Sequence, residues 1–161
     1  MIVADSSALI SLGSADALEL TLKEFEIHTT ETVIGELEET SEYEDLHGRA
    51  AEKVLENLEK IEIHEVHNQK FQSSRIDKGE GSCITLTQQK EADFLITDDM
   101  RALPELQTVS DTKVAISPII LKALVKREVI SNSQAKERLE KAAENRDWLG
   151  SPIYRKAKDL F

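Results

Sequence analysis

The sequence contains a single cysteine, Cys83, and only 4% of its 161 residues are aromatic. One cysteine forms no disulfide within the chain and leaves no cysteine pair for a zinc site. No apolar run approaches the roughly 18 residues of a membrane span, and the start of the chain reaches Asp5 without the basic residues of a secretion signal. We therefore expect a soluble, cytoplasmic protein that contacts no membrane.

Basic residues are also scarce, since 20 Lys and Arg stand against 31 Asp and Glu. Residues 1–112 hold nine basic and 25 acidic side chains, whereas residues 113–161 hold eleven and six. This acidity argues against a general nucleic-acid coat protein, whose binding rests on phosphate neutralisation. An acidic body with a basic last third suits a protein that collects cations in one place and contacts a polyanion in another. A solvated acidic surface beside an ordinary Lys-rich helix pair explains the same numbers.

Apolar residues make up 40% of the chain, which is enough for one core. Short apolar runs near residues 2, 26, 63, 95 and 115 predict five strands, and amphipathic segments between them predict helices. This alternation predicts an α/β fold with three α/β/α layers and a mainly parallel sheet, followed by C-terminal helices. We expect residues 1–161 to form a single domain, with residues 131–161 as a helical C-terminal extension.

Local signals place several element ends. We expect Thr32 to cap a helix after the second strand, and an amphipathic helix over residues 50–61. A polar surface loop over residues 67–81 should end where Asp77 caps the next helix. Pro104 is expected to cut a short helix, and Pro152 to lie in the first turn of the last one.

Acidic side chains follow the predicted strands at one edge of the sheet. Asp5 ends the first strand, Asp98 and Asp99 end the strand near residue 95, and Glu36 and Glu80 lie in the first turns of helices that begin at that edge. Carboxylates a few ångströms apart repel one another unless a cation lies between them. Oxygen ligands of this kind favour Mg²⁺ or Mn²⁺ over zinc, which points to metal-assisted phosphodiester chemistry.

Each acid also has a purely structural explanation. Asp77 and Glu80 have the spacing of a capping box, so Glu80 is either a cap or a ligand. Asp5 and Asp98 could equally cap the helices that follow them, and Glu36 could be an acid that the helix dipole stabilises.

Other residues that resemble ligands or reactive groups receive structural interpretations. We expect Cys83 to be a small core residue, because nothing basic adjoins it in sequence. His64 and His67 lie on and just beyond a strand, where solvated or structural roles are favoured over metal binding. Trp148 should anchor a joint between two helices.

The acidic motifs resemble those of the PIN-domain family, metal-dependent nucleases that include VapC-type toxins of toxin–antitoxin pairs. The resemblance runs through VADSSALI (residues 3–10), ETVIGELE (31–38) and DKGEGSCITLTQQKEADFLITDD (77–99). The tail VAISPIILKALVKREVIS (114–131), with WLGSPIYRKAKDLF (148–161), is similar to a PIN-like subgroup of uncharacterised prokaryotic proteins.

The resemblance implies a metal-dependent endoribonuclease. It assigns metal-binding and catalytic roles to Asp5, Glu36, Glu80 and Asp99, and to Asp98 as a further acid. Thr97 or Ser7 would support these acids by hydrogen bonds. We expect Mg²⁺ or Mn²⁺ as cofactor, RNA as substrate, a homodimer and, for a toxin, an antitoxin protein as partner. The chain departs from many relatives at Gly81, a second glycine early in a helix.

Two rival functions fit parts of the pattern. A receiver or haloacid-dehalogenase-like phosphatase also places an aspartate after its first strand, but such folds need a strand-end lysine or a second aspartate that is missing here. The alternative to catalysis is a non-catalytic PIN-fold module that binds RNA or another protein.

Overall fold

The computed structural model describes residues 1–67 and 71–161, and its centre is a five-stranded sheet in which every described pairing is parallel. The strand order is β3-β2-β1-β4-β5, so the chain first builds outward from β1 in one direction and then returns to build in the other. The carboxyl ends of β1 and β4 therefore flank the point where the strand order reverses, the position at which such sheets bind ligands. The strands are β1 (Ile2–Ala4), β2 (Ile27–Thr30), β3 (Glu62–His64), β4 (Phe94–Ile96) and β5 (Lys113–Ala115).

The register of the three strands β1, β4 and β5 fixes which residues meet at the carboxyl edge. Ala4 pairs with Ile96, and Ile96 pairs with Ala115. Asp5 and Thr97 consequently follow adjacent strand ends, and the Asp5 amide donates to the Ile96 carbonyl at 3.1 Å. The central residues of β1 and β4 are buried, as expected for a parallel sheet covered on two faces.

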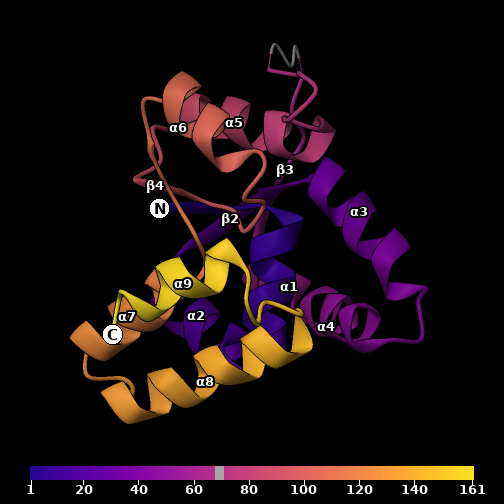
Figure 1. Ribbon diagram of the computed structural model, residues 1–161. Coiled ribbons are helices and arrows are strands. Elements are labelled where there is room, and N and C mark those ends of the chain that lie inside the picture. Colours follow the sequence, from indigo (N-terminus) through magenta and orange to yellow (C-terminus); the bar gives the residue numbers. More distant parts are fainter. Residues whose placement is uncertain (68–70) are drawn as a thin grey trace.

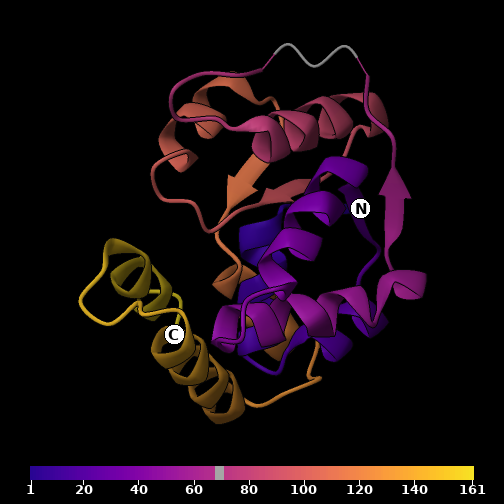
Figure 2. The ribbon, with the colours of Figure 1, turned by 90° about the vertical axis from the view of Figure 1, so that its right-hand side faces the viewer.

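Helices cover both faces of the sheet (Figures 1 and 2). Helices α5 and α6 lie on one face, whereas α1, α2, α4 and the C-terminal helices α7 to α9 lie on the other, and α3 packs against both α4 and α5. This arrangement confirms the three-layer α/β/α prediction. The helices are α1 (Ser6–Ser14), α2 (Leu18–Glu24), α3 (Glu31–Ser41), α4 (Leu46–Leu55), α5 (Lys78–Lys90), α6 (Leu103–Val109), α7 (Pro118–Lys126), α8 (Asn132–Asn145) and α9 (Pro152–Lys158).

Three local predictions differ from the structure. Thr30 rather than Thr32 caps α3, because the strand ends at Thr30 and its Oγ1 accepts from the Val33 amide at 3.2 Å. The helix predicted over residues 50–61 begins earlier and ends at Leu55, with a separate 3₁₀ turn over Leu58–Lys60. Pro104 lies in the first turn of α6 and so starts this helix instead of cutting it, since a first-turn residue needs no amide hydrogen bond.

Other local predictions are confirmed. Asp77 caps α5, Pro152 opens α9, and Trp148 is buried between α8 and α9. Of the loop predicted over residues 67–81, positions 68–70 lie outside the described residues.

The C-terminal extension packs against the helices that cover one face of the sheet. Helix α8 packs against α1 and α7, and therefore contacts the layer that carries the first helix of the chain. The single-domain organisation stays a prediction. Among residues 1–67 and 71–161, none of the helices combines the length and apolar character that crossing a bilayer requires.

Candidate active site

Asp5 both caps α1 and lies buried at the carboxyl end of β1. Its Oδ1 accepts hydrogen bonds from the Ala8 amide at 2.9 Å and from Ser7 Oγ at 2.7 Å, and its Oδ2 accepts from the Thr97 hydroxyl. Burial raises the pKa of Asp5 to about 7, although these hydrogen bonds favour the ionised form. Ser7 and Thr97 thus both donate to the Asp5 carboxylate.

Glu36 reaches the same edge from α3. Its Oε2 accepts from Ser6 Oγ at 2.6 Å, next to Asp5 in sequence, and its carboxylate also accepts from the Gly79 amide in the first turn of α5. Desolvation by burial raises the pKa of Glu36, and the negative charges of Asp77 and Glu39 add to this effect. Glu36 therefore bridges the start of α1 and the start of α5.

Glu80 serves as a cap and as a neighbour of a second acid. Its Oε2 accepts from the Asp77 amide at 2.8 Å, and the Asp77 Oδ1 accepts from the Glu80 amide at 2.9 Å, which completes a capping box. The Glu80 side chain also hydrogen-bonds to Asp99. Burial, together with this hydrogen bond, raises the pKa of Glu80 to about 9, so Glu80 keeps its proton at neutral pH.

Asp99 completes the group from the turn after β4. Its Oδ1 accepts from the Arg101 amide at 2.9 Å and from the Ala102 amide at 3.1 Å, which fixes the turn. Its own amide donates to Thr97 Oγ1 at 3.2 Å, and Thr97 in turn donates to Asp5.

These contacts, together with two pairs of residues adjacent in sequence, link four acids in a closed circuit, which we call the acid ring. From Asp5 the circuit passes through Thr97 to Asp99, from Asp99 to Glu80, from Glu80 to its neighbour Gly79, and from Gly79 through Glu36 and Ser6 back to Asp5. The buried Cys83 lies within the electrostatic reach of three of the ring's carboxylates. The acid ring therefore consists of Asp5, Glu36, Glu80 and Asp99.

Asp98, the fifth predicted acid, faces away from the ring. Its Oδ1 accepts from the Ser117 amide and its Oδ2 from Ser117 Oγ, both at 2.6 Å. Both acids lie beyond the end of β4, where the chain directs Asp98 toward Ser117 at the start of α7 and Asp99 toward Glu80 of α5. The Asp98 amide donates to Ser7 Oγ at 2.9 Å, which connects it to Asp5 through the backbone only.

The remaining candidate ligands have structural surroundings. Cys83 is fully buried, and desolvation raises its thiol pKa well above the ordinary value. His64 lies 2.8 Å from the Nδ1 of His28, with the two rings stacked 5.0 Å apart, and His67 lies near Glu65 on the surface.

The donors of the acid ring fit a hard divalent cation in their chemistry. All four side chains offer carboxylate oxygens, and three have pKa values raised by burial, so their ionised forms lack compensating charge. Within the described residues, no three His, Cys, Asp or Glu side chains converge on one point as a metal-holding group. Mg²⁺ keeps several waters and binds one or two carboxylates directly, so a hydrated ion suits this spacing.

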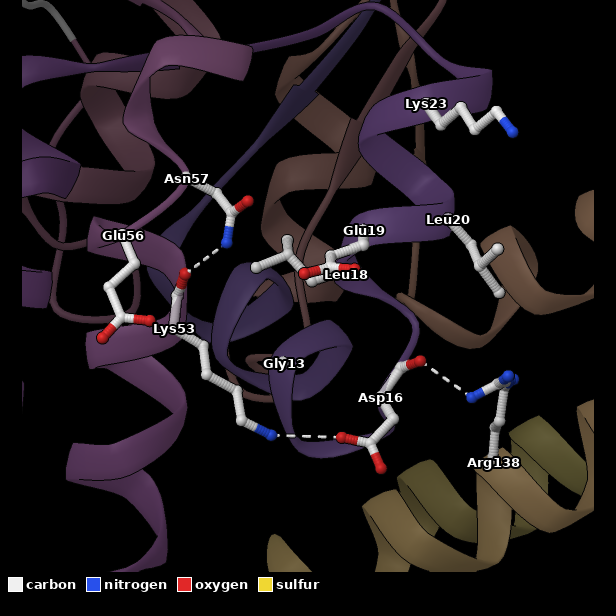
Figure 3. Close-up of a pocket in the computed structure, with 10 residues that line it drawn as sticks. All are labelled: Gly13, Asp16, Leu18, Glu19, Leu20, Lys23, Lys53, Glu56, Asn57 and Arg138. Atoms are coloured by element: carbon white, nitrogen blue, oxygen red, sulfur yellow. Dashed lines mark hydrogen bonds and ion pairs between the residues drawn. The ribbon is translucent and has the colours of Figure 1, made fainter.

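One cavity lies away from the acid ring. It measures about 640 Å³ and lies beyond the C-terminal end of α1, opposite the end that Asp5 caps (Figure 3). Asp16 lines this cavity together with Lys53 and Arg138. Its side chain accepts from Lys53 Nζ at 3.1 Å, and its carbonyl accepts from Arg138 Nη1 at 2.8 Å. None of the four ring acids lines this cavity.

Comparison with known proteins gives one match. The sequence model of the family described as PIN domain matches residues 1–161, and the chain therefore belongs to the PIN-domain family. PIN domains are generally nucleases and typically use divalent metals. No curated protein and no solved structure matches the chain significantly.

Sequence reasoning missed the residues that position the ring. Ser6 and Gly79 hold Glu36, and Ser117 holds Asp98. Gly79 carried a signal, because a glycine in the first turn of a helix beside a candidate acid marks a close approach. Ser6 and Ser117 carried none, since serine is common at helix starts.

Proposed function

We propose that this protein is a metal-dependent endoribonuclease that hydrolyses RNA phosphodiester bonds at the acid ring. The observation that carries the proposal is the closed circuit of contacts through Asp5, Asp99, Glu80 and Glu36 in a chain of the PIN-domain family. Asp5 and Glu80 are buried and Glu36 and Asp99 are half-buried at the strand-order reversal. Gathering four carboxylates there costs stability, and helix capping alone would not require it.

The ring acids would hold Mg²⁺ or Mn²⁺ between them. A divalent cation at such a site lowers the pKa of an attacking water and offsets negative charge on the phosphate oxygens. Thr97 and Ser7 orient Asp5, and Ser6 and the Gly79 amide orient Glu36.

Glu80 keeps its proton at neutral pH in the absence of a cation, because burial raises its pKa to about 9. Binding of a cation would release that proton, since ligands of Mg²⁺ and Mn²⁺ must be ionised. Asp98 has a positioning role in this proposal, because Ser117 occupies both of its oxygens.

The finer assignments rest on the family resemblance. We propose RNA as the substrate, and a role as the toxin of a toxin–antitoxin pair with an antitoxin protein as partner and a homodimer as the assembly. The excess of basic residues over 113–161 offers an anion-attracting region, although Arg127 is engaged with the Glu24 carbonyl at 2.8 Å and packs over the Phe25 ring.

The test is cleavage of a labelled single-stranded RNA by the full chain with Mg²⁺ or Mn²⁺, with and without EDTA. A single-stranded DNA of the same sequence is the control substrate. Wild type should cleave RNA only with metal, and Asp5→Asn should be inactive while keeping its fold by circular dichroism. Activity that survives EDTA, or an active Asp5→Asn, would overturn the proposal.

A non-catalytic binding module is the second candidate. It is favoured by the finding that no three metal-binding side chains of the described residues converge on one point. RNA binding without cleavage under any metal, with equal affinity for wild type and Asp5→Asn, would support it.

A further inference from the structure

Arg146 joins the C-terminal extension to the helix that carries Asp5. It follows the last residue of α8, and its Nε donates to Ser11 Oγ on α1 at 3.1 Å. Its Nη1 donates to the Nδ1 of His47 in the first turn of α4 at 3.0 Å, since a guanidinium can only donate. One side chain thus connects three helices that lie up to 135 residues apart in sequence.

The partners of Arg146 lead to the back of the acid ring. Ser11 is 1% exposed and donates to the Ser7 carbonyl at 2.9 Å, and Ser7 Oγ in turn accepts from the Asp98 amide at 2.9 Å. Ser7 itself contacts Asp5. Arg146 is therefore connected through Ser11 and Ser7 to both Asp5 and the Asp98 backbone.

The charge of Arg146 acts on both of these acids. Burial lowers the pKa of Arg146, whereas the charges of Asp98 and Asp5 raise it. Removing a guanidinium from water is costly unless negative charges compensate, so its placement here matches two carboxylates that are themselves buried. Attachment of α8 alone does not require this charge, as Asn145 Nδ2 already donates to the Ser14 carbonyl at 3.0 Å.

We infer that Arg146 is a positioning residue of the acid ring, whose positive charge offsets Asp98 and Asp5 from behind and so limits how tightly the ring binds a divalent cation. The inference rests on the proposed metal site. A fixed positive charge near a cation site weakens cation binding by Coulombic repulsion, and this repulsion is large where water is excluded. If Arg146 only held the helices together, its replacement would loosen the ring and weaken cation binding.

The variants separate charge from attachment. Arg146→Gln removes the charge but keeps an amide that can donate to Ser11, and it should bind Mn²⁺ several-fold more tightly than wild type. Arg146→Lys keeps the charge and should bind like wild type. Arg138→Gln is the matched control, since Arg138 lies on α8 and bonds to the Asp16 carbonyl in the turn after α1, far from the ring.

The experiment is calorimetric titration of each full-length, metal-free variant with Mn²⁺, without RNA. Tighter binding by Arg146→Gln, with Arg146→Lys and Arg138→Gln unchanged, is the expected result. Equal or weaker binding by Arg146→Gln overturns the inference and leaves the proposed function intact. Absence of Mn²⁺ binding by wild type overturns the proposed metal site itself. If Arg146→Gln fails to fold, Arg146→Met, which retains the aliphatic packing, carries the same expectation.

Discussion

The Glu36 carboxylate lies directly against the backbone of Gly79, so closely that a Cβ atom at position 79 would overlap its oxygens. The Gly79 amide donates to the same carboxylate. Gly79 has no unusual φ angle, so the need for glycine here comes from the approach of an acid from another helix. Helices α3 and α5 are thereby linked through a candidate ligand.

Gly79→Ala should displace the Glu36 carboxylate without unfolding the protein. The clash is with the end of a flexible side chain, which can move, and alanine favours a helix by up to about 1 kcal/mol over glycine. We expect an unchanged or higher melting temperature together with a loss of cleavage and of Mn²⁺ affinity. Gly35→Ala on α3 is the control, because nothing lies within 4 Å of a Cβ there. Full activity of Gly79→Ala would show that the position of Glu36 is unimportant.

The Glu80→Gln variant distinguishes a role of Glu80 as a metal ligand from its role in the capping box of α5. Glutamine preserves the hydrogen bond from the Asp77 amide, so the capping box and the stability should persist. The charge that draws a divalent cation is lost, and cleavage should fall by orders of magnitude. Asp77→Ala should cost about 1 kcal/mol of stability as a lost cap, with most cleavage retained. Cleavage rates and urea unfolding of both variants make the test, and wild-type activity in Glu80→Gln would remove this residue from the site.

Asp98→Asn and Asp99→Asn should differ in their response to metal. A cation that binds only the folded state adds about 2.7 kcal/mol of stability at a hundredfold excess over its Kd. Asp98→Asn should keep this Mn²⁺-induced rise in melting temperature, because asparagine can still bond to Ser117. Asp99→Asn should lose most of it. The reverse order would mean that Asp98 is the ligand.

Asp16 should contribute a pH-dependent part of the stability. The hydrogen bond from Lys141, with that from Lys53, lowers the pKa of Asp16 below 3.8. A folded pKa below the unfolded value gives stability that is present above pH 3.8 and is lost as the pH falls through the folded value.

The melting temperature of Asp16→Asn should therefore fall less than that of wild type when the pH is lowered from about 5 to about 3. Asparagine suits the test because Asp16 has a φ of 53°, a conformation that asparagine tolerates. The effect is modest, since the Asp16 side chain is 41% exposed and solvent screens its ion pairs. Identical pH profiles for the two proteins would contradict the assignment.

The fold and the edge that carries the acids were predictable from the sequence. Short apolar runs alternating with amphipathic segments are the signature of a parallel sheet. Asp5 and Asp99 lie just after strands, and Glu36 and Glu80 lie in the first two turns of helices that begin at the same edge. The errors at Thr32 and Pro104 each concern where a helix begins, which apolar periodicity places only to within a turn.

The inner arrangement of the site was not predictable in the same way. Adjacent acids Asp98 and Asp99 look equivalent in sequence, and only knowledge of which helices cover each face separates them. Arg146 lies beyond every motif of the site, and its tie to Ser11 spans 135 residues, so no local pattern marks it. Such contacts are set by how the layers pack.

The central claim is that Asp5, Glu36, Glu80 and Asp99 together bind one divalent cation. Crystals grown or soaked with Mn²⁺, with diffraction recorded near the manganese absorption edge, test it directly. The account predicts an anomalous peak among these four carboxylates in wild type and its absence in Asp5→Asn. An empty ring at saturating Mn²⁺, or a peak only at Asp98 or at the cavity beside Asp16, would contradict it.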